Sequence, residues 1–552
     1  MRSKKTNNKL TISYREFFFY LYFAVMFGMR MWGVYEGTML YGPLLVLGFL
    51  LWGVSVLMTR HTVLEYLIMG AFLALAAVVY LNSGEKGLLL YFTHMLGMKN
   101  IYIKKLFKVG IVAGGIGMAL LVFLTSFGIL EEVAYLQSRP HIGTIFRHAL
   151  GMPHPNTLSS SFFIISVMVM YVIGHEDRIK VWKTSGILAV IAAYLYSYSG
   201  SRTGIAINFG YLALNLFYAY RKKTGIIEKT ILTLLLPVIW GVSILLPALA
   251  TDALIDKLLA IDHTLMSRLE IGKDYLQKCP VTLFGTVVFD GTQRYGIDLS
   301  QLNLFLNLGI IAFVVVSVLN IWLVADEVKE NRISELVITF TYLVMGVTDP
   351  FLYNISFKNL CFVFMGAMIY RYLAEVHDRI PQWMRAEIQP IGIEDAKIAV
   401  DFPGWIISLK ESARKLSCKK RGIAFICSVS LALLSAALIY IMSPVPQFAL
   451  ADRNEREHIL IKELVGKTYT EGEIEEIKSH GNVVLNYTDE NELMYVYYSD
   501  ENEPIEGGYY SKNAALMEKV RKSISVLFWG TIGAYGIIII AESGINLKKE
   551  RI

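Results

Sequence analysis

This chain has few charged residues and few cysteines, and it carries none of the common nucleotide-binding or metal-binding motifs. Only 18% of its 552 residues are charged, against about 25% in a typical soluble domain. The four cysteines show no paired spacing, so we expect neither a disulfide framework nor a metal site. The sequence has no P-loop, no glycine-rich dinucleotide turn, no HExxH and no Asp-x-Asp pair, which argues against nucleotide chemistry and against a cofactor.

Long apolar runs recur from residue 17 almost to the C-terminus. Hydrophobic residues make up 55% of the chain, and the mean hydropathy is +0.48. Such runs can cross a hydrocarbon core of about 30 Å, so we expect an all-α polytopic membrane protein with about 14 transmembrane helices. The fourth run is short and could be re-entrant. The predicted spans lie near 17–35, 38–58, 62–82, 86–98, 111–130, 158–174, 184–200, 205–220, 231–251, 303–325, 333–348, 359–377, 423–442 and 523–542.

The basic residues indicate the orientation of these spans. With the N-terminus inside, every loop assigned to the cytoplasm carries lysine or arginine, as the retention of positive charge there requires. We therefore predict that both termini are cytoplasmic. The net charge of +6 is explained by these loops and needs no nucleic acid partner. No small-residue cleavage pattern follows the first apolar run, so we interpret this run as a span and not as a signal peptide.

The polar stretches between the spans divide the chain into three parts. The predicted parts are a core at 1–377 with outer loops 131–157 and 252–302, a cytoplasmic linker at 378–422, and a two-helix anchor at 423–552 that carries an extracytoplasmic insertion at 443–522. In the linker, residues 405–420 suit a helix lying on the inner interface.

The insertion has the pattern of a small α+β module. Its first half is charged with helical spacing, and its second half alternates in strand fashion at 483–487 and 493–498, which predicts a hairpin. We hypothesise that this module recruits a partner or binds growing polymer. The alternative is a dispensable insertion.

Four arginines are predicted to lie on the outer face, where the topology does not explain them. A cation that ends up outside needs another reason to be there. We expect that reason to be an anionic substrate at the outer membrane surface, most simply a lipid diphosphate. The four are Arg139, Arg147, Arg202 and Arg268.

The link between the seventh and eighth spans places Arg202 at the outer mouth of the bundle. Gly200 and Gly204 flank it and would let the backbone approach a ligand, while Ser201 precedes it. A guanidinium there can grip phosphate oxygens through two hydrogen bonds. The alternative is an arginine that reaches up to lipid headgroups.

The loop before the sixth span offers a second group of polar residues. Two prolines bracket His154 and fix its backbone, which suits a side chain that must be positioned. We expect function at Arg147, His154 and Asn156. For His141 and His148 we favour a rigid turn with solvent-exposed histidines.

Two carboxylates lie at the outer ends of later spans. Asp298 could cap the tenth span, or it could accept a proton from an attacking sugar hydroxyl. Asp349 lies in another outer link and could cap a helix or pair with an arginine. Arg268 begins a helical stretch in the same long loop as Asp298.

Taken in order, these residues resemble the O-antigen ligase/polymerase family, and specifically the Wzy-type polymerases of bacterial capsule and exopolysaccharide assembly. The resemblance covers about residues 1–377 and rests on a collinear set of short motifs. The matching motifs are 85–87 with 97–101, 147–156, 201–204, 267–269, 284–285, Asp298 and 309–311, while Gln301 stands where family polymerases often carry an aromatic residue.

The resemblance implies a GT-C-like core of twelve helices plus two more, in a bacterial cytoplasmic membrane with the active site facing outside. It implies an enzyme that joins undecaprenyl-diphosphate-linked repeat units into a polysaccharide at the outer leaflet without a metal. It also implies that membrane lipid is a partner of the enzyme, and that flippase and chain-length regulator proteins are its protein partners.

By the same resemblance, Arg202 and Arg268 would bind the diphosphate, with Arg147 as a third ligand. Asp298 would activate the acceptor hydroxyl. His154 is the second catalytic candidate. Further substrate contacts are assigned to Arg139, Asn156, Ser201 and Asp349. We expect Arg202 and Arg268 to converge on one pocket.

Two other functions fit the same sequence. A flippase of lipid-linked oligosaccharide would also have many spans, but it should show two similar halves with binding groups near the midplane. A ligase would keep the fold and move the glycan to another acceptor.

Overall fold

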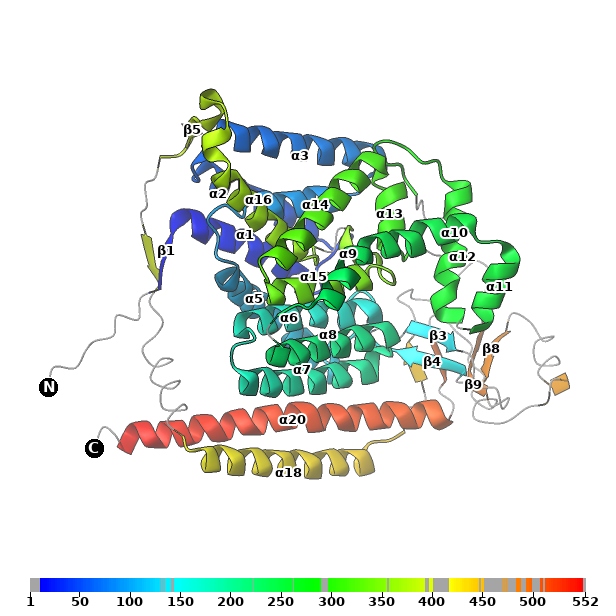
Figure 1. Cartoon of the computed structure of the whole chain (residues 1–552). Coiled ribbons are helices and arrows are strands. Elements are labelled where there is room, and N and C mark those ends of the chain that lie inside the picture. Colours follow the sequence, from blue (N-terminus) through cyan, green and yellow to red (C-terminus); the bar gives the residue numbers. More distant parts are fainter. Residues whose placement is uncertain are drawn as a thin grey trace.

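The computed structural model describes most of the chain and is mainly helical (Figure 1). The described residues are 10–130, 132, 135–139, 143–221, 223–261, 263–288, 296–354, 357–392, 397–400, 416–445, 448–450, 470, 472–473, 483–487, 493–498, 507–509 and 512–549.

The helices follow the apolar runs of the sequence, and every predicted span contains at least part of one. They are α1 (Tyr14–Met31), α2 (Tyr41–Leu57), α3 (Val63–Ser83), α4 (Gly87–Leu96), α5 (Ile103–Ser126), α6 (Pro155–Ile173), α7 (Arg178–Ser199), α8 (Arg202–Arg221), α9 (Ile226–Trp240), η1 (Gly241–Leu245), α10 (Leu246–Leu249), α11 (Asp252–Ile261), α12 (His263–Lys278), α13 (Ser300–Leu306), α14 (Gly309–Lys329), α15 (Ile333–Met345), η2 (Pro350–Leu352), α16 (Cys361–Glu375), η3 (His377–Arg379), η4 (Gln382–Arg385), α18 (Cys418–Met442) and α20 (Lys512–Lys549).

Within the described residues, eight helical segments are long and apolar enough to cross a membrane. This gives the chain the architecture of a multi-pass membrane protein. The eight are Val63–Ser83, Ile103–Ser126, Pro155–Ile173, Arg178–Ser199, Ile226–Leu249, Gly309–Lys329, Lys419–Met442 and Leu516–Ser543.

The described strands form five antiparallel pairs. These pairs are β1 (Leu10–Ser13) with β6 (Lys397–Val400), β2 (His61–Thr62) with β5 (Glu387–Ile388), β3 (Tyr135–Arg139) with β4 (Gly143–Arg147), β7 (Phe448–Leu450) with β10 (Gly507–Tyr509), and β8 (Val483–Tyr487) with β9 (Leu493–Tyr498).

The hairpin predicted in the insertion is present at the predicted residues, as β8 and β9. Its predicted helical half lies almost entirely outside the described residues. The β3–β4 hairpin was not predicted, and neither were β5 and β6, which join the linker to the residues that start α3 and α1. The interfacial helix expected at 405–420 falls mostly on residues outside the described ranges.

The tenth predicted span is present as α14 but begins later than predicted, because the chain breaks between α13 and α14. Gly309 has a left-handed φ of 88°, and Gly285 has a φ of 87°. A Cβ on Gly309 would lie 2.2 Å from the backbone nitrogen of Gly285. The backbone N–H groups of Ile310 and Ile311 donate to the carbonyls of Thr282 and Leu283 (3.0 and 3.1 Å). The loop backbone therefore enters at the break, where only glycine leaves room for it.

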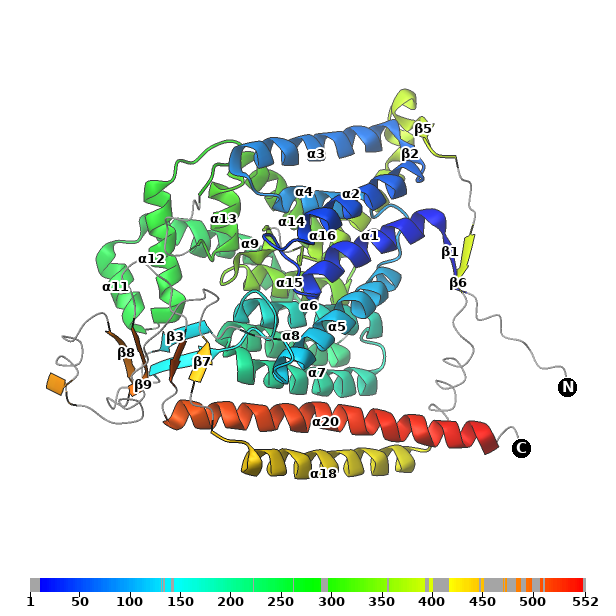
Figure 2. The same ribbon diagram turned by 180° about the vertical axis from the view of Figure 1, so that it is seen from behind.

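The helices stack in layers from α3 on one side to α20 and α18 on the other (Figures 1 and 2). Consecutive helices α5, α6, α7 and α8 pack against one another, and α20 packs along α7. The α7–α20 contact includes stacked rings of Tyr194 and Phe528, with centroids 4.2 Å apart, and the hydroxyl of Ser525 within 2.9 Å of the Tyr194 hydroxyl.

The segments predicted to be extracytoplasmic gather at one end of this helical body. The hairpins β3–β4 and β8–β9 and the helices α11 and α12 lie there, whereas β1 and the C-terminal end of α20 lie at the opposite end (Figures 1 and 2). Strand β4 also contacts β8. The long loops predicted to be extracytoplasmic thus lie at the same end of the molecule.

Candidate functional site

A polar cavity of about 410 Å³ lies among four segments that are distant in sequence. They are the end of α1 with the turn after it, the start of α6, the residues before α13, and the link between α15 and α16. The end of α1 that lines the cavity is the one far from β1, and the start of α6 follows β4 in the chain (Figure 2). The cavity therefore lies towards the end of the molecule that carries β3 and β4. Its polar lining includes His154, Asn156, Asp298, Asp349, Arg30 and Lys358.

His154 begins α6 and lines the cavity as the residue before its first turn. Its Nδ1 accepts a hydrogen bond from the backbone N–H of Asn156 (3.1 Å), and Pro155 occupies the first helical position. Burial, aided by the charge of Arg147, lowers the pKa of His154 to about 4. The imidazole is therefore neutral near pH 7, and with Nδ1 accepting, the ring proton lies on Nε2. His154 can donate a hydrogen bond into the cavity.

Arg147 does not line the cavity, although the sequence assigned it to the diphosphate. It is buried behind Asn156. Its Nη2 donates to Oδ1 of Asn156 (2.6 Å), and its Nε donates to the carbonyl of Ser199 (2.7 Å). This arginine joins the end of α7 to the start of α6 and fixes the Asn156 amide at the cavity wall.

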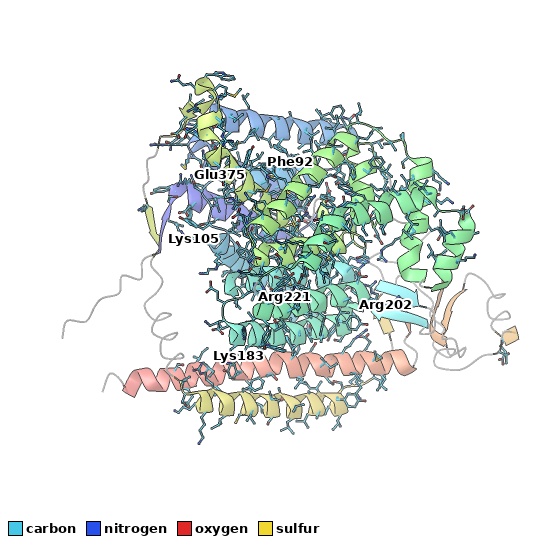
Figure 3. All side chains as sticks on the ribbon, viewed as in Figure 1. Phe92, Lys105, Lys183, Arg202, Arg221 and Glu375 are labelled. Carbon is cyan, nitrogen blue, oxygen red and sulfur yellow. The ribbon has the colours of Figure 1, made fainter. Side chains whose placement is uncertain are left out.

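Arg202 is exposed at the start of α8 and is not part of the cavity lining. Figure 3 shows it at the end of the bundle where β3 and β4 lie, away from Lys105 and Lys183. The hydroxyl of Ser201 accepts from the backbone N–H of Gly204 (3.3 Å). Residues 201–204 thus have the geometry of a helix start.

The two neighbouring glycines have different structural roles. Gly200 ends α7 in a left-handed conformation, with φ of 55°. A Cβ on Gly204 would lie 2.3 Å from the Cβ of Ser159, so this glycine allows α8 to pack closely against α6. The space beside Gly204 is therefore filled by α6 and not by a ligand.

Arg268 reaches the cavity through Asp298. Its Nε lies 3.2 Å from Oδ2 of Asp298, which does line the cavity, whereas Arg268 itself does not. The interpretation of Asp298 as a helix cap is wrong, because α13 follows Leu299 and has no side-chain cap. Burial raises the pKa of Asp298, against the opposing charge and hydrogen bond of Arg268. The expected convergence of Arg202 and Arg268 on one pocket is not found in this cavity.

Asp349 lies on the opposite stretch of chain, directly before η2. Its Oδ1 accepts from the backbone N–H of Phe351 (3.1 Å), so it does cap a short helix, as one of the sequence interpretations allowed. Its carbonyl accepts from the hydroxyl of Ser300. Burial raises the pKa of Asp349 to about 6, against the lowering effect of the Lys358 charge.

Lys358 is a cavity residue that the sequence analysis missed. Only 3% of its surface is exposed, and its Nζ donates to the hydroxyl of Ser160 (3.3 Å). Tyr91 and Tyr342 hold its backbone, accepting from the N–H and donating to the carbonyl (3.2 and 2.9 Å). Burial lowers its pKa to about 8, against the raising effect of Asp349. The preceding Phe357 has a φ of 56°, a costly conformation for an aromatic residue.

Arg30 is the second cation that the assignment of site residues left out. It stands in the last turn of α1, where its Nη2 donates to the hydroxyl of Tyr41 (3.3 Å) and its guanidinium carbon lies 4.8 Å from the centre of that ring. One signal could have found both cations. Arg30 and Lys358 are each a basic residue beside an end of an apolar run that the sequence predicts to lie outside, where that topology does not call for positive charge.

The remaining predictions for the loop before α6 have mixed outcomes. Arg139 belongs to β3, but its side chain lies outside the described residues, and so does His141. His148 was expected to be solvent-exposed, and this is wrong. Its ring nitrogens lie 3.3 Å from Oε2 of Glu132 and 3.2 Å from Oε1 of Glu518 on α20.

Two of the short motifs, 85–87 and 284–285, make close backbone contacts with distant segments. The glycine of 284–285 contacts the break before α14, and a Cβ on Gly87 would lie 2.0 Å from the carbonyl oxygen of Tyr353. Gln301 donates from Nε2 to the hydroxyl of Tyr353 (3.1 Å). These close backbone contacts hold the α15–α16 link, which carries Asp349 and Lys358, against α4 and α13.

The arrangement brings two cations, three carboxylates (Glu36, Asp298 and Asp349), a neutral imidazole and the positive end of a helix to one cavity. Such a site can bind an anion and transfer a proton beside it. Comparison of the chain with protein-family models, with curated proteins and with solved structures gave no match.

Proposed function

We propose that this protein is a membrane glycosyltransferase that joins undecaprenyl-diphosphate-linked oligosaccharide repeat units into a polysaccharide. The observation that carries the proposal is the cavity in which Lys358 and Arg30 stand beside Asp298 and Asp349. A transferred glycan leaves a diphosphate behind, so negative charge on phosphate oxygens must be stabilised, and an incoming hydroxyl must lose a proton. The cavity has both kinds of group.

In this proposal the chain crosses a bacterial cytoplasmic membrane about 14 times, with both termini in the cytoplasm. The end that carries β3–β4 and the cavity then faces outside, where the lipid-linked substrate is presented. The basic loops of the sequence support this orientation. Flippase and chain-length regulator proteins would be its partners.

The diphosphate would be held by Lys358, Arg30 and the N-terminal turn of α6, with His154 and Asn156 as hydrogen-bonding groups. Arg268 would contribute through its ion pair with Asp298. We keep Arg202 in the proposal as a surface charge that draws the anionic lipid towards the cavity, since it is exposed at the same end.

The test is polymer formation by the purified protein in lipid nanodiscs, supplied with a lipid-linked oligosaccharide and no nucleotide. We expect a ladder of products from the wild type, and a loss of at least about a hundredfold in Lys358→Met, which removes the buried charge. Lys183→Met is the matched control, because Lys183 is an exposed lysine on α7 far from the cavity.

Other products would point to the other functions. Movement of the lipid across a vesicle bilayer without polymer would establish a transporter. Transfer of a single glycan to a different acceptor would establish a ligase.

A further inference from the structure

We propose that Asp349, and not Asp298, accepts the proton of the attacking sugar hydroxyl. This inference rests on the proposed function and assigns the acid–base role within it. It follows from how the carboxylates and the imidazole of the cavity are already engaged, and Glu36, the third carboxylate of the lining, is paired with Lys86.

The Asp349 carboxylate is held in place by one oxygen. Oδ1 accepts from the N–H of Phe351, and the Asp349 carbonyl accepts from the hydroxyl of Ser300, so the side chain and the backbone are both fixed. Among the described residues, none donates a hydrogen bond to Oδ2. A fixed carboxylate with an oxygen available at a cavity wall has the geometry that a general base requires.

Asp298 is engaged differently. Its Oδ2 lies 3.2 Å from Nε of Arg268, and 44% of its side chain is exposed to solvent. A carboxylate stabilised by a guanidinium gives up part of its proton affinity. The ion pair with Arg268 thus opposes the effect of burial on Asp298 and occupies its Oδ2, whereas Asp349 forms no ion pair among the described residues.

His154 cannot replace either carboxylate in this role. Its Nδ1 already accepts from the N–H of Asn156, and its other nitrogen carries the ring proton. The imidazole can donate to a phosphate or sugar oxygen, but it has no nitrogen left to receive a proton.

The electrostatics of the cavity fit this assignment. Burial raises the pKa of Asp349, with the Lys358 charge opposing it, so the carboxylate is a stronger base than an exposed aspartate. A diphosphate bound at Lys358 brings negative charge towards Asp349 and raises its proton affinity further. The base thus becomes strongest when the donor is in place.

The step balances without another reactant. The acceptor oxygen forms a bond to the anomeric carbon of the donor, and the bond between that carbon and the phosphate oxygen breaks. Its electron pair leaves with the undecaprenyl diphosphate. The hydroxyl proton passes to Asp349 and is then released to the diphosphate or to solvent.

The experiment compares kcat, KM and the pH profile of polymer formation for three variants in nanodiscs. For Asp349→Asn we expect a fall in kcat of about 10²–10⁴-fold with little change in KM. For Asp298→Asn we expect a loss of no more than about tenfold. Asp252→Asn, which alters an exposed carboxylate paired with Lys273 on the same long loop, should be unchanged.

Binding of undecaprenyl diphosphate to Asp349→Asn checks that the variant is folded. Should it not bind, Asp349→Glu decides, because it keeps the carboxylate. Partial activity with a displaced acidic limb of the pH profile supports the proposal, and an undisplaced limb overturns it. A wild type that polymerises together with an active Asp349→Asn overturns this inference alone, whereas a wild type that makes no polymer overturns the proposed function as well.

Discussion

Arg268 on α12 and Asp298 before α13 form an ion pair, with 3.2 Å between Nε and Oδ2. The pair joins the long loop between α10 and α13 to the cavity wall. We predict that Arg268→Ala and Asp298→Asn each lower kcat/KM, and that the double variant loses less than the product of the two effects. The coupling should be about 1 kcal/mol, or about fivefold, because the carboxylate is partly solvated.

The measurement is a double-mutant cycle on polymer formation. Asp252 and Lys273 form a second ion pair on the same loop (2.6 Å) and supply the control cycle, which should show no coupling in activity. Fully additive effects of Arg268→Ala and Asp298→Asn would show that the two side chains act independently.

Arg202 should act through its charge alone. Because it is exposed and does not line the cavity, Arg202→Lys should keep most of the polymerase activity, while Arg202→Ala should raise KM several-fold in a manner that weakens with added salt. Steady-state kinetics at two ionic strengths measure this. If Arg202→Lys instead abolished activity, the result would support the bidentate contact between Arg202 and phosphate that the sequence predicts.

Gly285 should not tolerate a side chain. Gly285→Ala would place a Cβ 2.2 Å from the carbonyl oxygen of Asn307 at a φ of 87°, so we expect a loss of stability of about 2–3 kcal/mol. Thermal unfolding of the purified protein in detergent reports the loss. Gly296→Ala is the matched control, since nothing lies within 4 Å of its added Cβ. Equal unfolding temperatures for the two variants would contradict the close backbone approach.

His148 should make the stability of the α20 contact depend on pH. Burial opposes its charge, but the hydrogen bonds and charges of Glu132 and Glu518 outweigh burial and raise its pKa to about 9. Since this exceeds the usual value of about 6.5, the stabilisation is complete below about pH 6.5 and is lost as the pH rises through about 9. The loss amounts to about 3 kcal/mol at most.

Thermal unfolding measured between pH 6 and pH 10 tests the role of His148. We expect the wild type to lose stability across this range, and His148→Gln to lose much less, because its side chain does not titrate. A wild-type curve parallel to that of His148→Gln would remove the proposed ion network.

Some of this architecture could be predicted because it depends on neighbouring residues. Apolar runs must form helices in a membrane, since each backbone group has to find its partner within its own segment. The alternation at 483–487 and 493–498 predicts the β8–β9 hairpin for the same local reason. His154, Asn156, Asp298 and Asp349, which line the cavity, were singled out because polar residues at the span ends predicted to lie outside need an explanation.

Other features depend on distant segments meeting. The break before α14 arises because Gly285, from a separate loop, occupies the space beside Gly309. Likewise, arginine is a residue type that suits a phosphate ligand, yet the guanidinium of Arg147 donates its hydrogen bonds to Ser199 and Asn156. Local pattern carries no information on such partners.

The sequence by itself determined that this protein is a bundle of apolar helices with its unexplained polar residues collected in a few loops, because hydropathy acts on each segment separately. The tertiary structure decided which of those residues share a cavity. Lys358 and Arg30 line it while Arg202 does not, because the packing of α1, α6, α13 and the α15–α16 link sets which loop ends come together. A distance between two charges is a property of that packing and not of either loop.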